Sequence, residues 1–142
     1  MLMLTACGAM DATPPAEQTA FVAPSLPAHL AASPLVLHPW NAGGAGAAIS
    51  ARLVLEDGCL WLVGEESGGR WVPSFPYPGT DWDGAAVISV DEVVAVGEIA
   101  VFGGGESDLT EANLAAYDWI KPPDPDCLVG KGWFVYNGSA RP

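Results

Sequence analysis

The chain of 142 residues carries 17 acidic and 5 basic side chains, a formal net charge of −12 at pH 7. Proteins that bind nucleic acid neutralise phosphates with several Lys or Arg side chains, so the composition argues against a nucleic-acid partner. Anionic lipid headgroups would be repelled too, and any membrane contact must therefore come from something other than charge. The length suits one domain, and the 17 glycines and 13 prolines favour short strands and turns over long helices.

The chain begins with a short motif, Leu4-Thr5-Ala6-Cys7, that resembles the lipobox of bacterial lipoproteins. In that family the cysteine thiol receives a diacylglycerol and a dedicated peptidase cuts in front of it. The resemblance implies a lipid on Cys7, palmitate included, with residues 1–6 as the remainder of a signal peptide. A working signal needs a basic region and 7–15 apolar residues, so we expect translation to start further upstream. The alternative is a cytosolic protein in which the motif arose by chance.

Residues 7–40 are rich in proline and alanine, and no helical or strand period persists in them. A chain of this composition forms extended, semi-rigid stretches and has no fixed fold. We therefore expect residues 7–40 to be a flexible tether. Its roughly 30 residues, at about 3 Å each, would lift a domain up to about 90 Å from a membrane. Both histidines of the chain, His29 and His38, fall in this expected tether.

Residues 41–142 contain short apolar runs separated by turn residues, a pattern typical of β structure. Strands are predicted at 52–56, 59–63, 70–72, 85–90, 93–96 and 132–136, and the run 98–102 should continue the strand before it through a kink at Gly97. Asp57-Gly58 predicts a tight turn between the first two strands.

Three other segments of this domain are predicted as something other than strand. Residues 73–79 contain Pro73, Pro76 and Pro78, which cannot donate ladder hydrogen bonds, and should form an irregular crossing. Residues 103–106 are expected to form a tight backbone turn that ends a strand. A short helix should start near Ser107 or Asp108, with Glu111 as the reciprocal capping partner of Asp108.

The predicted elements define a mainly all-β fold, a small five- to six-stranded barrel, closed or partly closed, with one short helix. Several short sequence motifs across residues 50–136 occur in an order that also resembles a group of small lipoproteins from high-GC bacteria. These motifs are residues 55–60, 78–80, 96–98 and 103–106. This resemblance implies a β domain outside the cytoplasm and transfers no catalytic or binding residue.

Two cysteines remain if Cys7 is lipidated, and we expect Cys59 and Cys127 to form a disulfide. A loop of this length would stabilise the domain by about 4 kcal/mol in the chain-entropy model. Two separate buried thiols are the alternative. A zinc site is disfavoured, because the two cysteines and the two histidines do not have the spacing of a zinc ligand set. We predict neither a metal nor a cofactor.

One segment is the best candidate for ligand binding, because aromatic side chains gather beside acidic ones around the proline-rich crossing. Its members are Trp71, Phe75, Tyr77, Asp81, Trp82 and Asp83. Such a surface stacks on sugars or holds cationic or peptide ligands. The alternative is a lid of core aromatics that closes one mouth of the barrel, with Asp81 and Asp83 on a solvated loop.

No catalytic set is visible in the sequence, since both histidines precede the predicted domain and no Gly-x-Ser-x-Gly turn exists. We therefore expect a lipoprotein anchored on the extracytoplasmic face of the cell membrane, with a non-enzymatic domain that binds an envelope protein or a glycan. A glycan hydrolase that uses Asp81, Asp83 or Asp91 is one alternative. An assembly factor for a larger envelope complex is the other.

Overall fold

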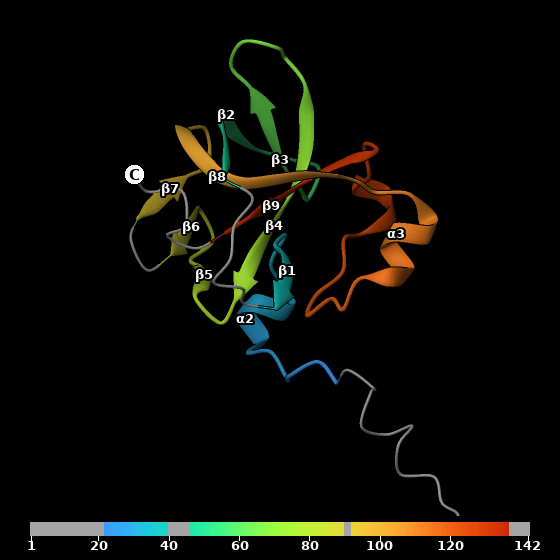
Figure 1. Cartoon of the computed structure of the whole chain (residues 1–142). Coiled ribbons are helices and arrows are strands. Elements are labelled where there is room, and N and C mark those ends of the chain that lie inside the picture. Colours follow the sequence, from blue (N-terminus) through green and yellow to red (C-terminus); the bar gives the residue numbers. More distant parts are fainter. Residues whose placement is uncertain (1–21, 40–45, 90–91, 137–142) are drawn as a thin grey trace, which may run out of the picture.

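A computed structural model describes residues 22–39, 46–89 and 92–136. The main feature is a sheet that closes into a barrel of five strands, ordered β4-β3-β2-β8-β9 and back to β4 (Figure 1). Its members are β2 (Ala47–Glu56), β3 (Cys59–Gly64), β4 (Arg70–Tyr77), β8 (Ile99–Asp108) and β9 (Lys131–Val135). The prediction of a mainly β fold built on a small closed barrel is confirmed.

The first hairpin forms because apolar residues alternate along β2 and fill β3. Leu53 in β2 is fully buried opposite Leu62 in β3, so both side chains point into the barrel. Asp57 and Gly58 both have positive φ, 53° and 79°, in the turn that joins the strands. A two-residue turn with left-handed backbone matches the twist of the paired strands, and this turn fixes their register.

The connections between the barrel strands follow a Greek key. β2, β3 and β4 run as an antiparallel meander, and β8 then returns to lie beside β2. β9 closes the ring by pairing antiparallel with β8 and parallel with β4. The barrel thus belongs to the five-stranded Greek-key architecture, which includes the OB-fold.

β4 corrects the prediction that residues 73–79 form an irregular crossing, because the strand runs on to Tyr77 through two buried prolines. It pairs in turn with β3 at 70–71, with β9 at 72–74 and with β1 (Val36–Pro39) at 74–77. Each neighbour contacts only a few residues of β4. Because the partner strand changes along β4, not every residue of β4 must donate a backbone hydrogen bond, and the prolines are tolerated.

β8 corrects the prediction of a turn at residues 103–106, since the strand continues through the glycines to Asp108. A Cβ on Gly104 would lie 1.7 Å from the carbonyl oxygen of Phe134 in β9. Glycine is therefore needed here for close approach of two strands, not for a reversal of the chain.

A second, three-stranded sheet is inserted between β4 and β8 and lies to one side of the barrel in Figure 1. It consists of β5 (Thr80–Trp82), β6 (Ala86–Ser89) and β7 (Val93–Ala95). β7 and β8 belong to different sheets, so the expected single kinked strand is wrong. The chain changes sheet at Gly97, whose φ of 92° is accessible mainly to glycine.

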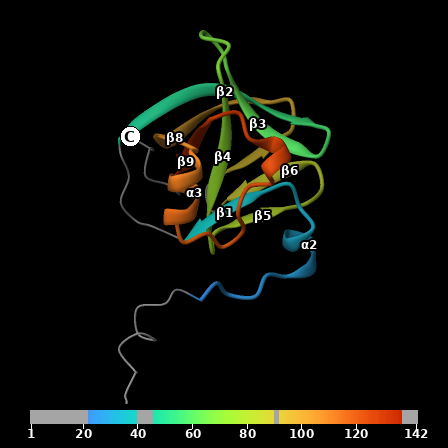
Figure 2. The same cartoon turned by 90° about the vertical axis from the view of Figure 1, so that its right-hand side faces the viewer.

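The expected tether of residues 7–40 also needs correction, because its described end is part of the domain. α2 (Ala28–Ala31) buries Leu30, and Leu35 and Leu37 are fully buried around β1. β1 lies parallel to β4, and the segment at Lys121 bridges its other edge (Figure 2). Leu30, Leu35 and Leu37 are thus core residues, and the domain begins well before residue 41.

Two further short helical segments follow β8. α3 (Glu111–Ala116) starts at Thr110, whose side chain accepts a hydrogen bond from the backbone N–H of Asn113, so Thr110 is the cap and not Ser107 or Asp108. The 3-10 turn η2 (Pro125–Cys127) follows and leads to β9. The domain therefore contains α2 and η2 besides the one helix expected.

Candidate functional site

A hollow of about 380 Å³ lies between the segment that carries α2 and the small sheet. Its volume is near the lower end of the range for small-molecule sites. The residues that line it are Pro27, His29, Leu30, Tyr77, Gly79, Thr80, Asp81, Ile88 and Ser89. The hollow is thus walled by apolar and aromatic side chains, with one carboxylate and one imidazole among them.

The end of β4 and the start of β5 bring most of this wall together. The chain leaves β4 at Tyr77 and turns through Gly79, whose φ is 121°. β5 then pairs antiparallel with β6, which sets Thr80 opposite Ser89 and Asp81 opposite Ile88. α2, which is far from these strands in the sequence, contacts β5 and supplies the rest of the wall.

His29 and Asp81 form the polar contact of the hollow. His29 Nε2 lies 2.5 Å from Asp81 Oδ1, and the two side chains are 53% and 56% exposed. The hydrogen bond from His29, helped by the backbone N–H of Trp82, holds the pKa of Asp81 below its usual range. Asp81 is therefore a carboxylate at neutral pH.

Thr80 gives the wall a buried hydroxyl. The residue is 4% exposed, and its Oγ1 has no hydrogen-bond partner among the described residues. A buried hydroxyl without a partner destabilises a fold by about 1–3 kcal/mol.

Of the six residues predicted to bind ligand, only Tyr77 and Asp81 line this hollow. Phe75 and Trp82 are buried in the core, 3% and 8% exposed, because β4 and β5 direct them inwards. Asp83 is exposed, and its Oδ1 accepts the backbone N–H groups of Ala85 and Ala86. Asp83 therefore shapes the turn before β6.

Trp71 lies at a different part of the barrel, near the β3–β4 loop. Its Nε1 donates to Glu106 Oε1 at 3.0 Å, and its ring meets Trp133 edge-on. Lys131 donates to the other carboxylate oxygen at 2.9 Å. Trp71 and Lys131 together lower the pKa of Glu106. The predicted aromatic site is thus divided between the core, the hollow and this contact.

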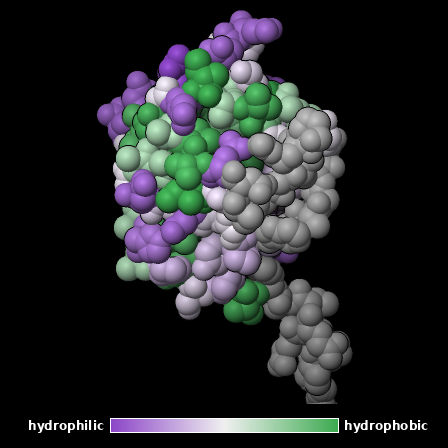
Figure 3. All heavy atoms as spheres, turned by 90° about the vertical axis from the view of Figure 1, so that its left-hand side faces the viewer, coloured by the Kyte–Doolittle hydropathy of each residue, from purple (hydrophilic) through white to green (hydrophobic). Residues whose placement is uncertain are grey.

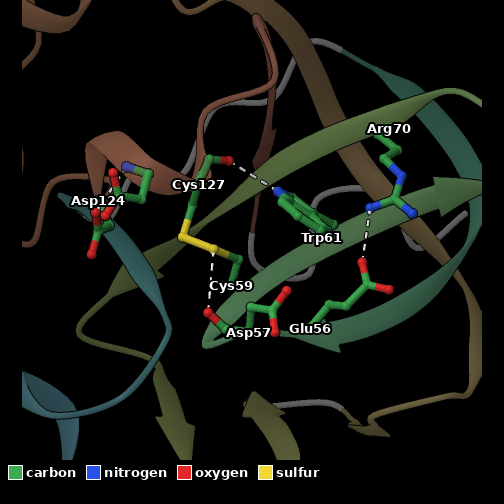
Figure 4. The surroundings of a disulfide bond; sticks show 8 residues. Glu56, Asp57, Cys59, Trp61, Arg70, Asp124 and Cys127 are labelled. Atoms are coloured by element: carbon green, nitrogen blue, oxygen red, sulfur yellow. Dashed lines mark hydrogen bonds and ion pairs between the residues drawn. A yellow bond between two sulfur atoms is a disulfide. The ribbon is translucent and has the colours of Figure 1, made fainter.

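Cys59 and Cys127 are joined by a disulfide, so the predicted pairing is confirmed (Figure 4). The bond links the start of β3 to η2 across 68 residues of sequence. Trp61 Nε1 donates to the carbonyl oxygen of Cys127, and the Arg70 guanidinium lies 4.6 Å above the Trp61 ring. η2, which precedes β9 in the chain, carries Cys127 to the start of β3.

His38 is a buried polar residue, although the sequence pattern places it in the tether. It is 6% exposed, its Nδ1 lies 2.7 Å from Ser74 Oγ, and its ring stacks on Phe134. Nε2 has no hydrogen-bond partner among the described residues. Burial lowers the pKa of His38 from 6.5 to about 4, although the backbone of Val135 opposes this shift. The imidazole is therefore neutral at neutral pH.

Most aromatic side chains of the C-terminal part gather around Phe134 and His38 and not at the hollow. Tyr117 and Trp119 meet Phe134 edge-on, and Tyr136 meets His38 in the same way. Tyr117 also shares a 2.6 Å hydrogen bond with Ser107. This group packs the chain after α3 against β9, so its first role is structural.

Apolar side chains are also exposed on the face of the molecule that carries β6, β7 and the start of β8 (Figure 3). Val93, Ile99 and Val101 are 58%, 40% and 62% exposed there. Figure 3 shows apolar surface on this face divided by polar residues. The face is thus a second candidate contact surface.

Other kinds of site find little support in the described part of the chain. No three of its His, Cys, Asp and Glu side chains gather where they could hold a metal ion. None of its helices has the length and apolar character that crossing a bilayer requires. The motif Leu4-Thr5-Ala6-Cys7 lies outside the described residues, so the predicted lipidation of Cys7 stays a prediction.

Comparisons of the chain with protein families, with curated proteins and with solved structures find no match. The resemblance to small lipoproteins therefore rests on the short sequence motifs alone.

Proposed function

We propose that this chain is an extracytoplasmic lipoprotein, anchored in the cell membrane through Cys7, whose barrel domain binds a ligand and does not catalyse a reaction. The Cys59–Cys127 disulfide is the observation that carries the proposal. Disulfides form and persist in oxidising compartments and are rare in the cytosol. With that pair joined, Cys7 is the one remaining cysteine of the three, next to a motif that suits lipid attachment.

The composition of the hollow favours binding over glycan hydrolysis. Hydrolysis of a glycosidic bond uses two carboxyl groups about 5–10 Å apart, one on each side of the scissile bond. Asp81 lines the hollow, whereas Asp83 does not and is engaged by the turn before β6. Asp91 lies outside the described residues. A single carboxylate beside aromatic and apolar side chains suits recognition better than acid–base chemistry.

The exposed apolar face supports a second candidate function, an assembly factor for a larger envelope complex. Val93, Ile99 and Val101 would be covered by a partner protein in such a complex. Cross-linking from cysteines introduced at Val93 and Val101, with Glu65 as a distant control position, tests this function. Capture of one envelope protein from the first two positions and not from Glu65 is the expected result.

Mass spectrometry of the protein from its native membrane tests the main proposal. We expect an N-terminal fragment that starts at Cys7 and carries acyl mass, together with a linked peptide pair that contains Cys59 and Cys127. Cys7→Ala should move the protein to the soluble fraction, whereas Cys59→Ala should leave it in the membrane. An unmodified Cys7 in a cytosolic protein would contradict the proposal.

A further inference from the structure

We infer that the hollow between α2 and the small sheet binds a primary ammonium group carried on an aliphatic stem. The inference rests on the proposed function, a domain that binds a ligand, and adds the chemical class of that ligand. Two sources share this chemistry: a free diamine or polyamine, and the lysine side chain of a polypeptide.

The hydrogen bonds that described residues donate to Asp81 leave one of its carboxylate oxygens open. Both bonds that described residues donate to its carboxylate, from His29 Nε2 and from the Trp82 backbone N–H, go to Oδ1. Oδ2 therefore remains open to a donor from a ligand. Because a carboxylate only accepts, His29 donates through Nε2. An ammonium group, with three donors and no acceptor, matches the open Oδ2 of Asp81.

The charges around the hollow favour a cation. Asp81 is ionised at neutral pH, and no Lys or Arg is among the residues that line the hollow. The described basic side chains donate elsewhere: Arg52 to the Gly97 carbonyl, Arg70 to Glu56, Lys121 to the Ser33 carbonyl and Lys131 to Glu106. An incoming ammonium group therefore meets no Lys or Arg among the described residues that line the hollow, and the net charge of −12 draws it towards the protein.

The rest of the wall suits the stem of such a ligand. Pro27, Leu30 and Ile88 are apolar, and Tyr77 adds an aromatic ring that contacts methylene groups or attracts a cation. A carboxylate or phosphate ligand would meet Asp81 without a cationic partner. A sugar would find one aromatic residue here, because Trp71, Phe75 and Trp82 lie elsewhere.

The test is a titration of the full chain, followed by backbone amide NMR, with 1,5-diaminopentane and with a short peptide that contains one lysine. Pentan-1-ol and a peptide with norleucine in place of the lysine are matched controls without the charge. We expect both amines to shift the amides of Leu30, Asp81 and Trp82 in a saturable way, with the controls at least tenfold weaker. A response to the diamine alone identifies a small amine as the source, and a stronger response to the lysine peptide identifies a polypeptide.

Three variants test the residues. Asp81→Asn should weaken amine binding at least tenfold, and because its contact with His29 is exposed, the variant should fold. Glu65→Gln makes the same change in net charge on the distant β3–β4 loop and should leave the affinity within twofold. His29→Gln keeps an N–H donor for Asp81, so the affinity for the amine should stay within about threefold of that of the unchanged chain.

The failure of this inference is distinguishable from the failure of the proposed function. Equal binding of pentan-1-ol and the amine, shifts with an oligosaccharide alone, or equal loss in Asp81→Asn and Glu65→Gln would overturn the ammonium ligand. The absence of any amine response would also overturn it, and would mean that the contact between His29 and Asp81 only holds α2 against β5. The acylation of Cys7, read by mass spectrometry of the same preparation, is independent of all these outcomes.

Discussion

His38 and Asp81 show how two titratable side chains acquire different roles from their surroundings. His38 is enclosed by Ser74 and by aromatic rings, so burial keeps it neutral. Asp81 is exposed and receives hydrogen bonds, which keep it ionised. The first residue therefore ties the stability of the fold to pH, and the second gives the hollow its negative charge.

Acid should destabilise the domain through His38. The pKa of this residue is about 4 in the folded chain and 6.5 in the unfolded one, so below pH 6.5 the unfolded chain binds a proton that the folded chain does not. The free energy of unfolding should fall by about 3 kcal/mol between pH 7 and pH 4. Urea unfolding at a series of pH values measures this loss.

His38→Gln is the control for the pH effect. It should be less stable at pH 7, because the stacking on Phe134 is lost, but it should lack the slope between pH 6.5 and pH 4. An identical slope in both proteins would assign the acid sensitivity to other groups.

Gly104 is the residue where a single methyl group should matter most. Gly104→Ala would place a Cβ against the Phe134 carbonyl oxygen, so β8 and β9 would have to move apart. We expect a loss of about 3 kcal/mol or more in thermal unfolding, at the upper end for one substitution. Gly69→Ala, whose nearest neighbour would be the flexible Ser67 hydroxyl, should lose much less. Equal effects would show that the strand contact is not tight.

Residue roles of this kind are beyond prediction from the sequence. The partners of His29 and His38 lie 52 and 36 residues away, so no local pattern indicates them. Cysteine parity, by contrast, predicts the pairing of Cys59 with Cys127 without knowledge of the fold. The pattern of acidic side chains beside aromatic ones includes Tyr77 and Asp81, which line the hollow, but it also includes the core residues Phe75 and Trp82.

At the scale of elements, the strands with clear apolar alternation are predictable, and those that depend on distant partners are not. Residues 59–63 are predicted as a strand and form most of β3, whereas β1 and the proline-containing half of β4 are missed. β1 has four residues and is stable because β4 and the segment at Lys121 supply its hydrogen bonds. Local propensity gives no sign of such support.

Removal of β1 should therefore unfold the domain. A chain that starts at residue 41 loses Leu30, Leu35 and Leu37 from the core, each worth about 1.5–3 kcal/mol. That sum is comparable with the whole stability of a typical domain. Far-UV and near-UV circular dichroism should show loss of structure, whereas a chain that starts at residue 22 should melt as the full chain does. A stable product from residue 41 would restore the tether prediction.

The disulfide should make a separate contribution, because it restricts the unfolded chain. Closing a loop of 68 residues stabilises a fold by about 4 kcal/mol in the chain-entropy model. Reduction with a phosphine should lower the midpoint of urea unfolding, and the double variant Cys59→Ser, Cys127→Ser should show the same midpoint with or without reductant. No change on reduction would mean that the loop is already ordered in the unfolded state.

The whole molecule combines a small barrel with a strongly acidic surface. The composition alone predicts the mainly β class, since short strands and turns need many glycines and prolines. It does not predict the Greek-key order, because β9 pairs with β4 across almost 60 residues of intervening chain, and nothing local specifies that choice. Such an architecture supports many functions, so the function must be inferred from the site and not from the fold.

Salt should stabilise the folded molecule, since 17 acidic side chains outnumber 5 basic ones and repel one another. Screening shortens the range of their repulsion, so the midpoint of thermal unfolding should rise by several degrees between about 0.01 M and about 0.5 M NaCl. Glu65→Lys with Glu66→Lys reduces the charge on an exposed loop and should make the salt effect smaller. A midpoint that falls with salt would mean that attraction within ion pairs, such as that of Lys131 with Glu106, outweighs the repulsion.

The Cys59–Cys127 bond also decides which parts of the domain feel a mechanical load. If tension is applied at residues 22 and 136, the covalent path runs from β3 through the two sulfur atoms to η2. β4, the small sheet, β8 and α3 all lie inside the loop that this path bypasses. The force would detach α2, β1 and β2 at one end and β9 at the other. The part of the hollow's wall that β4, β5 and β6 form would carry no tension.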